Sequence, residues 1–444
     1  MATAPISFAR RAAADKDGPA LRQAMETAKR QLFGNADKAM AHPDYPRWRD
    51  EGTRIREEAV GRLPELLERF EERARAAGAE VHWARDAAAA RRIVAAIAKK
   101  HGCRSVIKSK SMLTEEIELN DGLERAGLEV LETDLGEYVV QLSGGRPSHI
   151  IAPIIHMTAK EVNALFAAKH GGGLKDSKEA IANFLVAATG SVAIVTNEGN
   201  GRFSGARPRV RVSVAGIEKV IPGLAELGKL LRLLPRAATG QHSSAYVSLA
   251  TGPGGGRHPE HHHIVLVDGG RSRLLAGKYR AMLRCIRCGS CMNHCPVYKT
   301  AGGLSYDSVY VGPMGAVLSP NLFGPRHDDL PHAATMCGAC SASCPVKIPL
   351  PELMRELRED QVEAGRESRL QKLLFALWLA AATRPRLYAF GARLASAVLR
   401  LVGGRAQRLD ALPGGAGWFA GRALRTPAER PFRFSSSASS RHDD

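Results

Sequence analysis

Apolar residues recur three and four positions apart in the first part of the chain, between about Leu21 and Ala77. The clearest series, interrupted by charged residues, comprises Ile55, Ala59, Leu63, Leu66, Leu67 and Phe70. Spacing of this kind places the apolar side chains on one face of a helix. Gly78 follows the series, and glycine commonly ends helices. The pattern predicts an N-terminal helical region over residues 1–79.

Short runs rich in β-branched residues alternate with helical stretches between residues 80 and 277. The expected strand segments are SVIK (105–108), LEVLETD (128–134), YVVQL (138–142), HIIAPII (149–155), SVAIVTN (191–197) and HIVLVDGG (263–270). The helical stretches between them are 87–100, 114–127 and 222–234. This alternation is typical of an open, mostly parallel sheet covered by helices on both faces. We therefore expect an α/β domain over residues 80–277.

The pattern changes after Lys278, where the chain becomes rich in cysteine, glycine and proline and loses sheet periodicity. Residues 278–365 contain so little apolar sequence that we expect a bound metal to hold this region together. A helix is expected from Pro351, with Gly365 at its end. Residues 366–444 are expected to form basic helices followed by a disordered end.

The charge balance favours acidic partners, since 63 Lys and Arg against 45 Asp and Glu give +18. Residues 384–434 contain ten arginines, no lysine and two acidic residues. This segment lacks nucleic-acid-binding motifs, so we expect no nucleic acid and favour an acidic subunit or peripheral membrane contact. The longest apolar stretch, 373–382, is too short to span a bilayer. Since the N-terminus shows no secretory signal, we expect a cytoplasmic protein.

Seven of the eight cysteines are concentrated in two motifs. Cys285, Cys288, Cys291 and Cys295 precede Pro296 with the spacing C-x2-C-x2-C-x3-C-P. This is the spacing of bacterial ferredoxin-type iron–sulfur motifs, in which the fourth cysteine ligates the neighbouring cluster.

The second motif has one cysteine fewer. Cys337, Cys340 and Cys344 precede Pro345, and alignment from the proline end places Ala334 where the first motif has Cys285. Exchange of the fourth ligands assigns two sets of thiolates. The first set is Cys285, Cys288, Cys291 and Cys344, and the second set is Cys295, Cys337 and Cys340.

The cysteine spacing predicts two iron–sulfur clusters. We expect [4Fe-4S] in the first set, whereas the second set would hold either [3Fe-4S] or a [4Fe-4S] cluster with a ligand other than cysteine. Zinc is the alternative, because CxxC pairs also form zinc ribbons. Seven cysteines, two Cys-Pro dipeptides and the absence of a CxxC-x15–20-CxxC spacing disfavour zinc.

Two polar segments that follow expected strands are candidates for ligand binding. Lys108, Ser109 and Lys110 lie between a strand and a helix, where cations and helix amides could receive a carboxylate or phosphate. The alternative is an ordinary helix start with Thr114 as its cap. Asn197, Glu198 and Asn200 occupy an equivalent position after SVAIVT. Open α/β sheets bind ligands at this edge.

Four histidines near one expected strand, at positions 258, 261, 262 and 263, suggest metal binding. Successive residues of a strand point to opposite faces, so these side chains cannot all reach one ion. We therefore expect them to lie at the surface without a metal.

The series of motifs resembles the lactate-utilisation iron–sulfur protein family. The matching segments include CIRCGSCMNHCPVY, CGACSASCPVKIPL, KSKSMLTEEIELNDGLE, TNEGNGR, GIEKVIPGL and LVDGGRSRLL. The resemblance implies a lactate-utilisation (LUD) domain with a fold like sugar isomerases and CoA transferases, followed by a ferredoxin-type domain. It also implies two companion subunits, a cysteine-rich redox subunit and a second LUD-domain subunit, that together oxidise L-lactate to pyruvate.

The expected function is electron transfer from a 2-hydroxy acid, L-lactate or another, through two neighbouring clusters. No flavin motif is visible, so the two-electron step requires a partner subunit, the open iron or an unrecognised site. The alternative function is a ligand-binding or CoA-transferase-like α/β module whose clusters act as a redox sensor.

Overall fold

The protein is described by a computed structural model in which the chain forms two compact units, residues 1–360 and 361–444. The described residues are 7–15, 23, 25–27, 33–109, 111–145, 147–149, 153–154, 157, 159–170, 182–196, 200–254, 259–366, 369–404, 407–412, 419 and 422–428.

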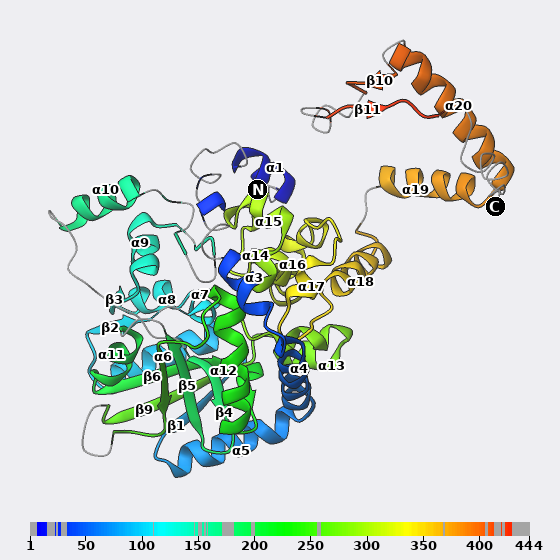
Figure 1. The fold of residues 1–444 in the computed structure, drawn as a ribbon. Coiled ribbons are helices and arrows are strands. Elements are labelled where there is room, and N and C mark those ends of the chain that lie inside the picture. The colour runs from blue at the N-terminus through cyan, green and yellow to red at the C-terminus, as the bar shows by residue number, and fades with distance from the viewer. Residues whose placement is uncertain are drawn as a thin grey trace. The chain divides into compact units, whose positions relative to one another are not determined.

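Amphipathic helices precede the first strand, as their apolar spacing predicts. They are α1 (Phe8–Asp15), α3 (Gly34–Met40), α4 (Tyr45–Gly61) and α5 (Leu63–Ala76). The predicted stripe on α5 is buried, with Leu66 and Phe70 fully inaccessible to solvent. Helix α3 and helix α4 both pack against α12 (Leu224–Thr239), beside the cysteine-bearing region (Figure 1). The N-terminal helices therefore contact both the α/β part and the cysteine-bearing region.

Five parallel strands lie in two small sheets. The larger has the order β1 (Glu80–Ala84), β9 (His261–Val267), β6 (Val210–Gly216), and the smaller pairs β2 (Ser105–Lys108) with β3 (Glu129–Glu132). The connecting helices are α6 (Ala87–Lys100), α7 (Met112–Glu116), α8 (Leu119–Arg125) and α9 (Leu135–Ser143). Apolar residues of α6, α8, β3 and β9 form one buried core. The predicted α/β class is confirmed.

A third sheet has the order β7-β4-β5-β8 and is largely antiparallel. Its strands are β4 (Ala182–Val186), β5 (Ser191–Thr196), β7 (Val220–Ile221) and β8 (Tyr246–Ala250). Helices α11 (Asn200–Ala206) and α12, with the 3-10 turn η2 (Ile217–Lys219), complete this part, whereas α10 (Ala159–His170) packs on α9. Strands β4 and β5 are joined by a short turn, which is the kind of connection that permits antiparallel pairing.

Two local predictions are corrected. YVVQL, expected as a strand, belongs to α9, because Asp134 caps this helix by accepting a hydrogen bond from the Glu137 amide. The cap of α7 is Ser111 rather than Thr114, since the Ser111 hydroxyl accepts from the Thr114 amide. Of HIIAPII, residues 150–152 and 155 lie outside the described part.

The cysteine-bearing region is built from short helices. They are α13 (Arg271–Ala276), η3 (Lys278–Arg284), α14 (Ser290–Asn293), α15 (Pro296–Ala301), η4 (Leu304–Tyr306), α16 (Gly312–Phe323), η5 (Pro325–His327), η6 (Leu330–His332), α17 (Ala339–Ser343) and α18 (Leu350–Glu363). The expectation that this region has little to bury is wrong. Most of α16 is buried, as are Tyr298, Tyr306 and Tyr310. These side chains share one core with α12 and β4.

The C-terminal unit contains α19 (Arg369–Ala382), α20 (Pro385–Gly403) and the short strands β10 (Arg408–Leu409) and β11 (Leu424–Arg425). Helices α19 and α20 pack on each other but leave many large apolar side chains exposed. Among the described residues, no helix is long and apolar enough to cross a bilayer.

Candidate metal centre

The two cysteine motifs have the same local backbone. Arg287 and Met336, each directly before a cysteine, adopt the left-handed region with φ of 60° and 57°. Gly289 and Gly338, each directly after that cysteine, have φ of 76° and 79°. Non-glycine residues rarely adopt this conformation, so its repetition shows that the loops are built alike. Cys288 therefore corresponds to Cys337, in agreement with the alignment from the proline ends.

Thiols of the first set influence one another. Burial raises the pKa of Cys288, and Cys344 and Cys285 raise it further. Burial likewise raises the pKa of Cys291, with additional contributions from Cys285, Cys288 and Cys344. Such mutual effects require that the sulfur atoms lie close together. The four cysteines thus lie near one another, although Cys344 comes from the second motif.

Thiols of the second set form a separate group. Burial raises the pKa of Cys340 to about 12, and Cys295 and Cys337 contribute to the shift. Cys295 is affected in the same direction by burial and by Cys337. Cys295 therefore lies with the cysteines of the other motif. Ala334 occupies the position equivalent to Cys285 and packs against the core.

Backbone amides point at the sulfur atoms of both sets. Hydrogen bonds join Arg287 N to Cys285 Sγ at 3.4 Å, Tyr298 N to Cys295 Sγ at 3.5 Å and Ile348 N to Cys344 Sγ at 3.4 Å. Amide donors stabilise the negative charge of thiolates and of the clusters that thiolates bind. The loops are therefore shaped for charged sulfur rather than for neutral thiols.

Two buried hydroxyl groups have no hydrogen-bond partner among the described residues, Tyr45 Oη and Tyr306 Oη. Burial raises the pKa of Tyr45, and Cys288 and Cys344 of the first set contribute. Burial also raises the pKa of Tyr306, with contributions from Cys295, Cys291 and Cys340. An orphaned buried hydroxyl calls for an acceptor, and cluster or thiolate sulfur beside each tyrosine would supply one. The residues present therefore fit iron–sulfur clusters.

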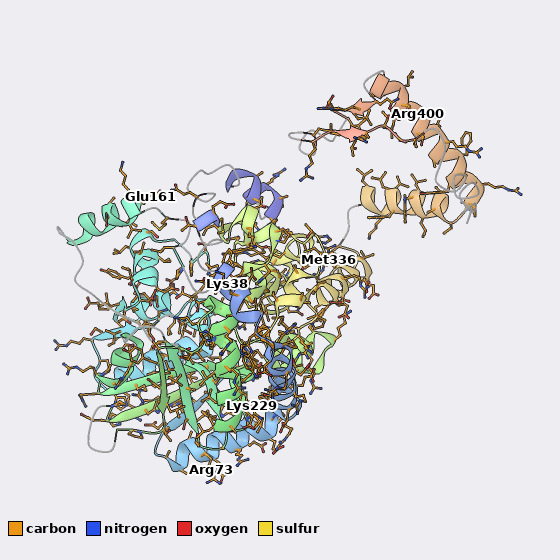
Figure 2. All side chains as sticks on the ribbon, viewed as in Figure 1. Lys38, Arg73, Glu161, Lys229, Met336 and Arg400 are labelled. Atoms are coloured by element: carbon orange, nitrogen blue, oxygen red, sulfur yellow. The ribbon has the colours of Figure 1, made fainter. Side chains whose placement is uncertain are left out.

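The two sets differ at one exposed cysteine. In the first set Cys288 and Cys344 are buried, and Cys285 and Cys291 are half-buried. In the second set Cys295 and Cys340 are also buried, whereas Cys337 is exposed. Met336, labelled in Figure 2, is also exposed and lies away from the strands. A hydrogen bond from the Thr335 side chain is the main cause that lowers the pKa of Cys337. The second set consequently reaches the protein surface.

A buried ion-pair network joins the α/β part to the first set. Arg271 donates to Glu116 through both terminal nitrogens at 2.9 and 2.6 Å and to Glu218 through Nε at 2.6 Å. Tyr310 donates to Glu116, and its ring lies 4.4 Å from the Arg287 guanidinium carbon. Burial opposes the charge of Arg271, but the two carboxylates raise its pKa above the usual value.

Two further cations lie close to Cys285. The Arg56 guanidinium is buried and donates to the carbonyl groups of four residues, Arg284, Val220, Glu218 and Leu283. Lys219 Nζ lies 3.5 Å from the carbonyl oxygen of Cys285. Burial lowers the pKa of Arg56 to about 10 and that of Lys219 to about 7. Arg56 therefore places a positive charge beside the first set, and Lys219 adds a basic group on the same side.

Sequence reasoning missed this cationic shell. The segments GIEKVIPGL and LVDGGRSRLL contain Glu218, Lys219 and Arg271, but their order alone did not show that they meet. Charged residues that end buried strands were the available signal, because a buried charge requires a partner.

Two cavities adjoin these elements. A cavity of about 90 Å³ lies between the sheet and the first cysteine loop, where Asn183, Lys219, Arg271, Arg287 and Tyr310 line it. A larger cavity of about 470 Å³ lies between β2 and β6.

The predicted ligand residues are only partly described. Lys108 and Ser109 line the larger cavity. Lys108 Nζ is buried between Glu115 and Glu132, at 2.7 Å from an oxygen of each, and these carboxylates raise its pKa against the effect of burial. Lys110, Asn197 and Glu198 lie outside the described residues, as does the side chain of Asn200. Ligand contact at this site stays a prediction.

Of the four histidines expected at the surface, two are buried, His261 is half-buried and His258 lies outside the described residues. His262 and His263 are buried on opposite faces. His262 hydrogen-bonds with Ser213 at 2.9 Å, and burial lowers its pKa to about 4. His263, Glu80 and His82 bring ligand atoms within 4.8 Å of one another. These three residues could hold a transition-metal ion.

Comparison with protein-family models finds two matches. Residues 67–267 match the LUD domain, and residues 281–348 match the 4Fe-4S dicluster domain. The second match includes all seven cysteines of the two sets.

Similar proteins cover most of the chain. Lactate utilization protein B of Bacillus pumilus (strain SAFR-032) is 36% identical over 441 residues, which span 93% of each chain. Lactate utilization protein B of Lysinibacillus sphaericus (strain C3-41) is 39% identical over 80% of each chain. Uncharacterized electron transport protein YkgF of Escherichia coli (strain K12) is 36% identical over 88% of this chain and 87% of its own. No solved structure matches the chain.

Proposed function

The chain belongs to the lactate utilization protein B family, and from that membership we propose that it is the iron–sulfur electron-transfer subunit of a multi-subunit system oxidising L-lactate to pyruvate. The observation that carries the proposal is the pairing of two thiol sets, one of which reaches the surface at Cys337. Tyr306 lies beside thiols of both sets, so the two sets are neighbours. Electrons could therefore pass from the interior of the protein to its surface.

The proposed ligands are those of the two thiol sets. Cys285, Cys288, Cys291 and Cys344 would hold a [4Fe-4S] cluster. Cys295, Cys337 and Cys340 would hold either [3Fe-4S] or [4Fe-4S] with a fourth ligand other than cysteine. When bound, these clusters supply one-electron transfer. Conversion of lactate to pyruvate releases two electrons and two protons, so two such centres match the number of electrons.

The surrounding residues have defined roles in this proposal. The amides of Arg287, Tyr298 and Ile348 donate to cysteine sulfur and so stabilise negative charge at the two sets. Arg56 places a buried positive charge near Cys285. The apolar core around α16 excludes water from the first set. The amides and Arg56 favour the reduced, more negative state, whereas the exclusion of water opposes it.

The exposed segment around Met336 and Cys337 is the proposed surface for electron exit. We propose that a cysteine-rich redox subunit and a second LUD-domain subunit complete the system in the cytoplasm. A two-electron step on lactate requires such a partner or a further site, because each proposed centre carries one electron.

The C-terminal unit supports a peripheral membrane contact. Arg386, Arg393 and Arg400 are spaced seven residues apart on α20, so they lie on one side of the helix (Figure 2 labels Arg400). Phe390 and Leu401 of the same helix are 66% and 83% exposed. Arginine beside exposed apolar side chains is typical of helices that bind anionic membrane surfaces. Cosedimentation with vesicles containing anionic lipid, but not with neutral vesicles, would support this contact; equal binding to both would contradict it.

A second candidate function rests on the cavity of about 470 Å³ beside Lys108. It has the size of a small-molecule site, so the α/β part could bind a CoA-like or sugar-phosphate ligand while the clusters sense redox state. Such a module would bind its ligand without any reduction of the clusters by lactate.

Anaerobic purification with the companion subunits tests the main proposal. We expect roughly seven or eight iron atoms per chain and electron paramagnetic resonance (EPR) signals of reduced clusters after L-lactate is added. Cys103→Ala is the matched control, because this cysteine belongs to neither set. Clusters that dithionite reduces but L-lactate never reduces in the complete system would contradict electron transfer from lactate.

A further inference from the structure

The cavity of about 90 Å³ lies where the α/β part meets the first cysteine loop. Its walls come from the start of α7, from β4, β6 and α13, from η2 with Glu218 and Lys219, and from Ile286, Arg287 and Tyr310. A single water needs roughly 10–15 Å³ of such space, so the cavity has room for a molecule of about six non-hydrogen atoms. L-Lactate is a molecule of this size.

The charges around this cavity are unevenly satisfied. Arg271 is saturated by two carboxylates, those of Glu116 and Glu218. By contrast, Arg287 Nη2 reaches Glu218 only at 3.4 Å, and its Nη1 lies against the Met314 sulfur at 3.2 Å. The carboxylates of Glu116 and Glu218 thus pair mainly with Arg271. Arg287 makes only a long contact with Glu218.

Lys219 is the second cation with little compensation. Among the described residues, its hydrogen-bond partner is the carbonyl oxygen of Cys285, at the long distance of 3.5 Å. A buried ammonium group without a close anion carries a high desolvation cost, which a bound carboxylate would offset. Lys219 and Arg287 line the same cavity and therefore present two cationic groups to one small ligand.

Asn183 supplies a neutral donor to the same space. Its carboxamide oxygen accepts a hydrogen bond from the Val195 amide at 2.7 Å, which directs the NH2 end elsewhere. Asn183 also lines the cavity, so its carboxamide is a neutral polar group beside the same space. A cation pair for a carboxylate and an amide for a hydroxyl are the groups that recognise a 2-hydroxy acid.

We propose that this cavity binds the 2-hydroxy acid, with the carboxylate on Lys219 and Arg287 and the hydroxyl at Asn183. The inference rests on the proposed function and assigns the ligand to this subunit. It places the ligand beside the first cysteine set and away from the second. The competing explanation is that the cations only balance the negative charge of a cluster held by the first set.

The test measures binding of L-lactate to the full chain after anaerobic reconstitution, by calorimetry. Asn183→Asp keeps the oxygen that accepts from Val195 and the side-chain volume, but adds a negative charge to the cavity. We expect it to weaken L-lactate binding at least tenfold, because like charges repel strongly in a buried site. Asn163→Asp on exposed α10 is the matched control and should change affinity less than twofold.

Lys219→Met separates the two explanations. Ligand binding predicts an at least tenfold weaker affinity for L-lactate. Charge balance alone predicts an altered reduction potential of the first cluster with L-lactate affinity unchanged, which would overturn the proposal. Iron content and EPR spectra establish that each variant still carries its clusters.

Propionate, which lacks the hydroxyl, tests the role of Asn183. We expect it to bind the original chain at least tenfold more weakly than L-lactate, because the amide would lose its partner. Absence of L-lactate binding to the original chain, or equal binding by the Asn183→Asp variant, would overturn the inference.

The electron-transfer function and the lactate-binding cavity would be contradicted by different results. If the variants behave as expected but L-lactate never reduces the clusters in the complete system, the cavity is a carboxylate site and the electron-transfer function is wrong. If L-lactate reduces the clusters equally in the original chain and in both cavity variants, the function stands and this cavity is not the binding site.

Discussion

The two cysteine sets share a backbone but occupy different surroundings. Their loops repeat the same left-handed residues, at Arg287 and Met336, and the same glycine positions. Yet Cys288 is enclosed by the core that α12 and β4 share, while Cys337 is exposed. The motif therefore determines the backbone conformation around each cysteine. The neighbouring elements determine whether that cysteine is buried or exposed.

The residues next to the two cysteine sets also differ. The first set lies against cationic groups such as Arg56 and Lys219, and it adjoins the small cavity. The second set lacks a fourth cysteine at Ala334 and opens at Met336. Both sets contribute buried cysteines to one core, and the second set also reaches the surface at Cys337. This asymmetry is what a relay from a ligand site to a partner requires, and it can be tested.

Replacement of one equivalent cysteine in each set should give the largest difference. Cys288→Ser places an unsatisfied hydroxyl in the shared core, at a cost of about 1–3 kcal/mol, and also removes a ligand. We expect a thermal midpoint lower by about 5 °C or more and faster proteolysis of residues 281–348. Cys337→Ser should lower the midpoint by only about 0–2 °C, because its side chain is exposed.

Both variants should lose the iron of one cluster. Iron analysis, thermal unfolding and limited proteolysis measure these effects. Equal loss of stability in the two variants would remove the distinction between an enclosed and an exposed set.

Single alanine replacements test the membership of each set. Because Cys295 affects Cys340 and Cys337, Cys295→Ala should abolish the same EPR signal as Cys337→Ala. Cys344→Ala should instead abolish the signal that Cys291→Ala abolishes. Cys103→Ala should preserve both signals. The crossed assignment is refuted if Cys344→Ala groups with Cys337→Ala.

Sequence patterns predicted β2, β3, β5 and β9 of the α/β part, but not β1, β4, β6, β7 or β8. Helix α6 has the expected bounds of 87–100, and SVIK forms β2 as expected. Local apolar periodicity carries this information because each element buries one face. The strand predicted for YVVQL is wrong because its β-branched residues also suit a helix once Asp134 caps that helix. Strand propensity alone could not show the cap.

The cysteine-bearing region was less predictable. Spacing identified the thiols, but glycine and proline concealed the apolar content of α16, which has no one-sided pattern because it is buried nearly all round. Contacts between residues far apart in the sequence, such as the ion pair of Arg271 with Glu116, depend on the tertiary fold. No local pattern specifies them, so the cationic shell and the small cavity emerged only from the structure.

Addition of a fourth cysteine to the second set should change lactate-dependent reduction only modestly. Ala334→Cys supplies the thiol that the alignment lacks, and we expect its iron content to be preserved or improved. If the ligand binds beside the first set, lactate-dependent reduction should remain within about twofold. A strong fall in this variant, with a demonstrated four-thiolate cluster, would show that the open position of the second set meets lactate.

Matched removal of the two orphaned hydroxyls should give the smallest effects. Tyr45 adjoins Cys288 and Cys344, whereas Tyr306 adjoins Cys295 and Cys340 and also Cys291. A hydroxyl that donates to sulfur stabilises the reduced state, so its loss should lower the reduction potential. One such hydrogen bond is worth about 1 kcal/mol, which corresponds to about 40 mV for one electron.

Tyr45→Phe should therefore lower the potential of the first cluster alone. Tyr306→Phe should lower mainly that of the second, with a smaller change in the first because of Cys291. Redox titration followed by EPR measures both potentials in one sample. Each phenylalanine keeps the aromatic packing, so a shift confined to one cluster reports the hydroxyl and not the fold. Identical shifts of both clusters in both variants would mean that the hydroxyls do not distinguish the two sets.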